Sequence, residues 1–146
     1  RSRERREVIR AMFSLETIGY YSDSPGSQRY PFPLGFFYPS TGNFIAFVSN
    51  LSSRPLLHEA LASFRRHAGI PSEAVAAPAW IPGVDWSDHW SFWREGWPAL
   101  MVTDTALYRY PHYHTERDTP DKVDYERLAR LVTGLHGMLR ELATRG

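Results

Sequence analysis

Residues 85–121 read DWSDHWSFWREGWPALMVTDTALYRYPHYHTERDTPD, and this stretch decides the fold. The apolar run at residues 98–102 predicts a strand that is covered on both faces, as in the interior of an α/β sheet. Polar residues gather at the exit of this strand, namely Thr103, Asp104 and Thr105. Because ligand sites in α/β sheets form beyond the carboxyl ends of strands, the stretch also predicts where a functional site lies.

The patterns on either side of this strand predict the rest of the sheet. Short apolar or alternating segments favour further strands at residues 12–18, 44–48 and 74–80. Ser87 is placed to cap a short aromatic helix that ends at Gly96. Strands and helices alternate after the first two strands, so we expect an α/β fold with a mixed, mainly parallel sheet flanked by helices.

Two longer helices are indicated by apolar stripes that can pack on the sheet. Ser52 or Ser53 can cap the first helix, whose stripe contains Leu56, Leu57, Ala60, Leu61 and Phe64. Asp124 is the expected N-cap of the last helix, whose stripe contains Leu128, Leu131, Val132, Leu135, Met138, Leu139 and Leu142.

Composition limits the classes of partner and compartment. The chain has 146 residues, no cysteine and a formal net charge of +1. Its length suits one domain over residues 1–146, in which residues 1–11 form a charged arm. The small net charge argues against nucleic acid as an obligate partner, and no apolar run is long enough for a membrane segment. The lack of cysteine excludes disulfides and thiolate ligands and leaves the localisation open.

Residues 22–40 are rich in Pro, Gly and Ser, with several aromatic residues among them. This composition is typical of a long loop, and long loops in small domains are often functional. The aromatic side chains could line a pocket or could cover the surface of the core, and the sequence does not decide between these two arrangements.

Two hydrolytic schemes can be compared on the residues alone. Ser87, Asp88 and His89 are the right types for a serine hydrolase, but adjacent side chains cannot converge as nucleophile, base and orienting group. A zinc site instead needs imidazole nitrogen and carboxylate oxygen. The candidate ligands are Glu16, Asp88, His89, Asp104, His112, His114 and Asp118. The alternatives are a salt-bridged Glu16 and histidines that only form hydrogen bonds.

Short motifs at residues 15–21, 87–89, 103–105, 112–115 and 118–119 add a further argument; they read LETIGYY, SDH, TDT, HYHT and DT. Together they resemble the C-terminal half of the di-zinc aminopeptidases of metallopeptidase family twenty-eight, which includes aminopeptidase Y and the bacterial leucyl aminopeptidases. The resemblance implies a three-layer fold like that of the zinc exopeptidases. It also implies that a pair of zinc ions removes N-terminal residues from a peptide substrate.

The resemblance also implies roles for individual residues. It identifies Glu16 as the acidic ligand of one zinc ion and His114 as the histidine ligand of the other, so these side chains should lie close together. Asp88, His89 and Asp104 would shape the site. Three further residues would face the substrate or the oxygens of a tetrahedral intermediate: Tyr108, Arg109 and Tyr113.

The chain departs from the family pattern before Glu16. The family's first histidine ligand, its bridging aspartate and its pair of consecutive glutamates all precede that position. Residues 1–15 contain no histidine, no aspartate and no consecutive glutamates. We therefore expect no general base in this chain, with the missing groups supplied by an N-terminal portion of the same domain. The alternative function is a non-catalytic peptidase-like domain that binds peptides or a protein partner.

Overall fold

Four strands form one open mixed sheet in the computed structural model, which describes residues 8–144. The strands are β1 (Met12–Leu15), β2 (Ile45–Ser49), β3 (Ser72–Ala76) and β4 (Ala99–Thr103). Their order in the sheet is β1-β4-β2-β3. β1 pairs with β4 and β2 pairs with β3 in parallel, whereas β2 and β4 are antiparallel. Two of the three pairings are parallel, which confirms the predicted mixed, mainly parallel sheet.

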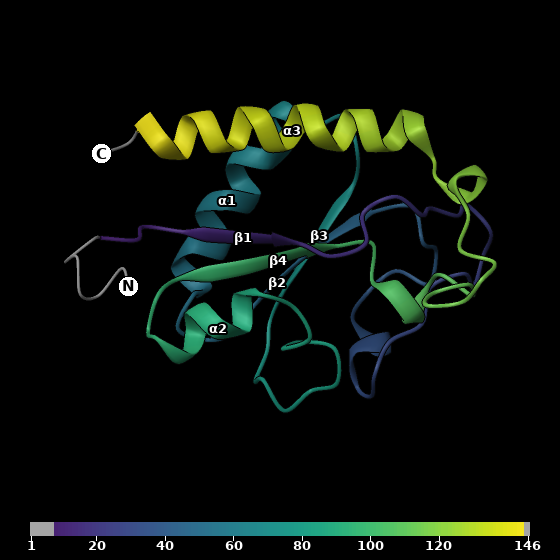
Figure 1. The fold of residues 1–146 in the computed structure, drawn as a ribbon, viewed down its shortest axis with the longest axis horizontal. Helices are drawn as coiled ribbons and strands as arrows, with labels where there is room; N and C mark the ends of the chain where they lie inside the picture. The colour runs from purple at the N-terminus through teal and green to yellow at the C-terminus, as the bar shows by residue number, and fades with distance from the viewer. Residues whose placement is uncertain (1–7, 145–146) are drawn as a thin grey trace.

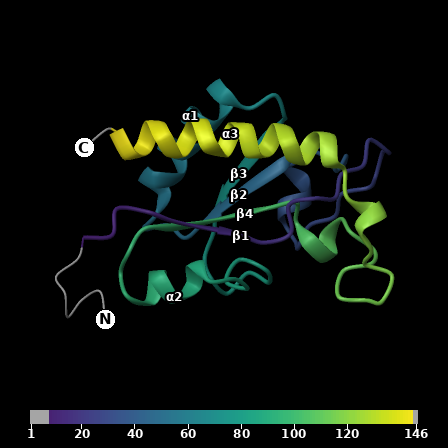
Figure 2. The ribbon, with the colours of Figure 1, turned by 45° about the horizontal axis from the view of Figure 1, so that its top comes forward.

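Helices cover the two faces of the sheet unequally. The long helices α1 (Arg54–His67) and α3 (Tyr125–Thr144) lie together on one face, and the short helix α2 (His89–Arg94) lies on the other (Figures 1 and 2). The larger core cluster lies between the sheet and the two long helices, with Phe47, Phe64 and Leu131 fully buried. A smaller cluster around Trp93 lies on the α2 side. This three-layer arrangement confirms the predicted fold class.

Proline and local hydrogen bonds correct several predicted boundaries. The strand expected at residues 74–80 is β3 at Ser72–Ala76, and turns follow it from Pro78 onward. Neither Ser53 nor Ser87 caps a helix through its side chain. Asp124 does, because the backbone N–H of Arg127 donates to Asp124 Oδ1 at 2.9 Å.

The exit of β4 is where the chain becomes irregular. A single turn of 3-10 helix, η2 (Ala106–Tyr108), follows it directly, and two similar turns occur at η1 (Leu34–Phe36) and η3 (Pro120–Lys122). Together with the loop before β2, these segments lie beyond the carboxyl ends of β1 and β4, and the loop before α2 lies beneath the sheet on its α2 side (Figure 1). The irregular segments are thus gathered at the end of the sheet where the sequence predicts a site.

One edge of the sheet is open at β1. Among residues 8–144, β1 pairs only with β4, and Leu15 of this edge strand is 52% exposed. Most of the predicted charged arm, residues 1–7, lies outside the described residues. No helix in the described part of the chain is both long enough and apolar enough to span a bilayer.

Candidate functional site

Asp104 ties together the segments that leave β1 and β4. Its Oδ2 accepts a hydrogen bond from the backbone N–H of Tyr20 at 2.8 Å, and its Oδ1 accepts one from the N–H of Ala106 at 3.0 Å. The side chain is almost fully buried, at 1% exposure. Because a buried carboxylate needs such donors, Asp104 holds two loops in fixed positions, and both of its oxygens are already engaged by the chain.

The backbone at these exits adopts strained conformations. Thr17 has a φ of 45°, Thr105 of 77° and Ala106 of 46°, all in the left-handed region that non-glycine residues rarely adopt. His114 has a φ of 57°. Strain of this kind persists only where the surroundings enforce it, and it is concentrated at functional sites. It therefore agrees with the site predicted beyond β1 and β4.

Glu16 occupies the first position after β1. Its backbone N–H donates to Val102 O at 3.0 Å, which extends the ladder between β1 and β4 by one residue. Its half-buried carboxylate accepts one weak hydrogen bond, from Ser87 Oγ at 3.4 Å. The Ser87 hydroxyl is in turn hydrogen-bonded to Ser14 Oγ. Ser87 thus orients Glu16 rather than capping α2.

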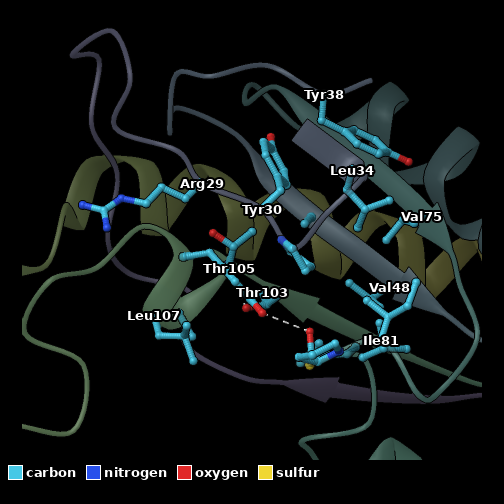
Figure 3. Close-up of a pocket in the computed structure, with 18 of the residues that line it drawn as sticks. Arg29, Tyr30, Leu34, Tyr38, Val48, Val75, Ile81, Thr103, Thr105 and Leu107 are labelled. Atoms are coloured by element: carbon cyan, nitrogen blue, oxygen red, sulfur yellow. Dashed lines mark hydrogen bonds between the residues drawn. The ribbon is translucent and has the colours of Figure 1, made fainter. Parts of the chain in front are cut away.

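A cavity of about 110 Å³ opens beside Glu16 on the α2 face of the sheet. Its walls come from the loop before β2, from the loop after β3 and from η2 (Figure 3). Most of the lining side chains are apolar or aromatic; they include Tyr30, Leu34, Tyr38, Ile81, Val84, Met101, Leu107, Tyr108 and Tyr113. The loop at residues 22–40 therefore lines a pocket, while Phe32, Phe36 and Phe37 of the same loop remain exposed.

Tyr113 connects Glu16 to the predicted ligand His114. Burial raises the pKa of the Tyr113 hydroxyl, and the negative charges of Glu16 and Asp104 raise it further. The rings of Tyr113 and His114 are stacked, with their centroids 3.9 Å apart. Tyr113 lines the cavity, whereas His114 is exposed beside it. Glu16 and Tyr113 thus line the same cavity, and His114 stacks on Tyr113 at its edge.

Two predicted site residues, Arg109 and His89, are buried and form hydrogen bonds to other parts of the chain. The Arg109 guanidinium is buried and donates to Gln28 Oε1 at 2.7 Å and to Phe44 O at 2.8 Å, so it does not line the cavity. His89 is fully buried, and its Nε2 lies 2.7 Å from Val84 O. Burial lowers the pKa of His89. Sequence motifs place such residues near a site but do not show which way they point.

The other predicted residues lie around the cavity in varied roles. Tyr108 lines it and donates its hydroxyl to Pro82 O at 3.3 Å. Asp88 is exposed. Asp118 accepts a hydrogen bond from the Tyr110 hydroxyl at 2.8 Å. His112 and His114 belong to a series of turns between η2 and η3.

The described residues do not by themselves complete a metal site. Among residues 8–144, no three His, Asp or Glu side chains are grouped closely enough to hold a metal ion. A catalytic zinc ion usually has three protein ligands. Glu16 and His114 have suitable donor atoms, and neither carries a strong competing interaction from its neighbours, so each fits a site as one ligand among several.

Some residues that shape the cavity were not predicted from the sequence. Ser87 was considered as a cap, yet its hydroxyl bonds Glu16. Glu73 and Val75 of β3 also line the cavity. Glu73 and Val75 alternate with Ala74, which indicates that both side chains project from the same face of a strand. The sequence did not show that β3 lies next to β2 in the sheet, so it did not place that face at the site.

Comparisons with known proteins agree with this architecture. The profile of Peptidase family M28 matches residues 2–138. The chain is 38% identical over 132 residues to uncharacterized protein YfbL of Escherichia coli (strain K12), covering 90% of this chain and 41% of that protein. It thus spans about two fifths of that relative's length.

Two solved structures from Legionella pneumophila share the fold. LapB superposes with a TM-score of 0.71 at 18% identity, covering 99% of this chain and 34% of LapB. The LapA aminopeptidase gives a TM-score of 0.66 at 17% identity, covering 99% of this chain and 33% of LapA. At such identities the likeness concerns the fold alone. Because the family profile matches nearly all of the sequence, the chain belongs to Peptidase family M28.

Proposed function

We propose that this chain forms the C-terminal part of a zinc-dependent aminopeptidase that removes N-terminal residues from peptides. Family membership supports a peptidase-like role in general. The observation that carries the more specific proposal is the position of Glu16. Its half-buried carboxylate stands at the carboxyl end of β1, on the wall of an apolar cavity that can receive a side chain.

In this proposal Glu16 and His114 each bind one ion of a zinc pair. Zinc, when bound, supplies a Lewis acid and lowers the pKa of a coordinated water. The chain's own contribution is to orient Glu16 through Ser87 and to hold the site's loops through Asp104. The apolar cavity would bind the side chain of the N-terminal residue and exclude water from it.

The remaining ligands and the general base would come from the rest of the M28 domain. The open edge of β1 supports this view, because an exposed strand edge can pair with a further strand. Leu15 on that edge is more than half exposed, and such an apolar residue suits a covered position.

The test compares the chain with the complete M28 domain. Residues 1–146 alone should not release p-nitroaniline from an aminoacyl anilide, even with added zinc, because a positioned general base contributes roughly 10²–10⁴-fold. The complete domain should release it, and a chelator should stop the reaction. His114→Ala in the complete domain should abolish activity, whereas His136→Ala, an exposed change on α3, should not.

Two results would count against this proposal. Strong, chelator-sensitive activity from residues 1–146 would show that the chain contains its own base. A complete domain that binds peptides without cleaving them would favour the non-catalytic alternative.

A further inference from the structure

The floor of the cavity is one row of side chains that crosses β4, β2 and β3 and ends at Glu16, the first residue after β1. Thr103 of β4 pairs with Ala46 of β2, and Ala46 pairs with Glu73 of β3. Glu16 is the next member of the row. Its backbone N–H donates to Val102 O, and this hydrogen bond places Glu16 beside Thr103. Directly paired residues project from the same face of a sheet. All four side chains therefore line the same cavity.

Glu16 and Glu73 stand at the two ends of this row. Three strand spacings separate them, or about 14 Å between backbones. Only Thr103 and the small Ala46 lie between them on the floor. The cavity is therefore an apolar trough with a carboxylate at each end, of which the proposed function uses only Glu16.

The Glu73 carboxylate has no partner within residues 8–144, since no hydrogen bond or ion pair reaches it there. Two tyrosine hydroxyls of the cavity are engaged elsewhere: Tyr38 donates to Ala74 O at 2.9 Å and Tyr30 donates to Pro39 O at 2.6 Å. Burial raises the pKa of both tyrosines, and the nearby charge of Glu73 adds to this effect. Arg29 lies on the side of the cavity away from Tyr38 and Val75 (Figure 3).

The half-buried Glu73 carboxylate faces an apolar cavity without a partner, and a ligand cation that enters the cavity can pair with it. We propose that Glu73 is a specificity-determining residue that binds the cationic end of a lysine or arginine side chain at the N-terminus of the substrate. This inference rests on the proposed function, since the substrate's N-terminal residue would enter at the Glu16 end. The inference extends that function from N-terminal residues in general to basic ones.

The walls of the cavity suit such a side chain along its whole length. Lysine and arginine bury apolar stems while their charged ends seek a polar partner. Met101, Val48 and Val75 form a second apolar row beside the floor and can contact the stem. The aromatic rings of Tyr30 and Tyr38 stand close to Glu73 and can contact the cation on their faces. A neutral side chain of the same length would leave Glu73 unpaired.

The first experiment measures kcat/KM of the complete domain for lysyl and norleucyl anilides, which differ only in the terminal charged group. We expect lysine to be preferred roughly ten- to hundredfold, the range typical of a hydrogen bond to a charged group. Glu73→Gln should remove this preference, chiefly by lowering kcat/KM for the lysyl anilide, and Glu73→Asp should keep part of it. Glu95→Gln makes the same charge change on an exposed residue outside the cavity and should have no effect.

The second experiment separates this inference from the proposed function. Calorimetry on chelator-treated complete domain measures binding of lysinamide and norleucinamide without catalysis. Tighter binding of lysinamide that is lost in Glu73→Gln supports the inference even if no anilide is cleaved. Zinc-dependent cleavage with equal rates for lysyl and norleucyl anilides, or a lysine preference that survives Glu73→Gln, would overturn the inference and leave the proposed function intact.

Discussion

Asp104 shows how one side chain can organise a site without reacting in it. Its two oxygens accept hydrogen bonds from the backbones of Tyr20 and Ala106, which belong to the segments after β1 and β4. Both segments contain left-handed residues, so their conformation depends on such external support. The carboxylate therefore maintains the position of Glu16 indirectly, through the loop that follows it.

Removing this carboxylate should cost stability. Asp104→Ala leaves two backbone donors without their partner in a buried place, and each such loss costs about 1–3 kcal/mol. We expect the free energy of unfolding, measured by urea denaturation, to fall by about 3 kcal/mol. Glu116→Ala, which removes an exposed carboxylate, should change it by less than about 0.5 kcal/mol. Equal effects of the two substitutions would contradict the role given to Asp104.

His89 should make stability depend on pH. Burial lowers its pKa in the folded protein below the ordinary value of 6.5, against the smaller raising effects of Val84 O and nearby carboxylates. The unfolded chain therefore binds the proton first as pH falls. The contribution of His89 to stability is fully present above about pH 6.5 and is lost as pH falls toward its folded pKa.

The matched variant for this prediction is His89→Phe, which keeps an aromatic ring against Trp93. Urea denaturation at several pH values between 7 and 5 should show a smaller loss of stability for the variant than for the wild type. Parallel pH profiles for the two proteins would exclude His89 as a source of the dependence.

At the scale of elements, α1 and α3 approach closely because α3 carries glycine at their contact. A Cβ on Gly134 would lie 2.5 Å from Ala68 Cβ and 2.7 Å from Phe64 Cε2. Both neighbours belong to a packed region, and Phe64 is fully buried. The helices therefore cannot keep their present separation if a larger residue occupies this position.

Two effects oppose each other in the Gly134→Ala variant. Alanine gains about 1 kcal/mol of helix propensity over glycine, but overpacking costs about 1–3 kcal/mol. Because the contact distances are so short, we expect net destabilisation in thermal or urea unfolding. Thr133→Ala, at the exposed neighbouring position, gains propensity without a clash and should not lower stability. A Gly134→Ala variant more stable than the wild type would contradict the packing described.

The elements also show what sequence can predict. Continuous apolar runs identified β2 and β4, and the stripe and cap of α3 were predicted because local patterns determine them. The end of β3 and the turns at His112 and His114 were not predicted, because prolines and long-range contacts determine them. The role of Glu73 depends on which strands become neighbours, and no local pattern contains that information.

At the scale of the whole molecule, the candidate site lies beside the open edge of the sheet. The sheet is open at β1, and Glu16 follows that strand directly. In the proposed function Glu16 and His114 are zinc ligands, and among residues 8–144 no three His, Asp or Glu side chains are grouped closely enough to hold a metal ion. We therefore expect zinc binding and the pairing of a further strand with β1 to occur together, in the complete M28 domain.

The most direct test is the zinc content of the complete domain, measured by mass spectrometry after dialysis. The wild type should retain a pair of zinc ions per molecule. Glu16→Gln and His114→Ala should each lose about one of them together with aminopeptidase activity, since each removes a ligand from a different ion. The exposed histidine variant His136→Ala should retain both ions. Full zinc content and activity in both ligand variants would contradict the account.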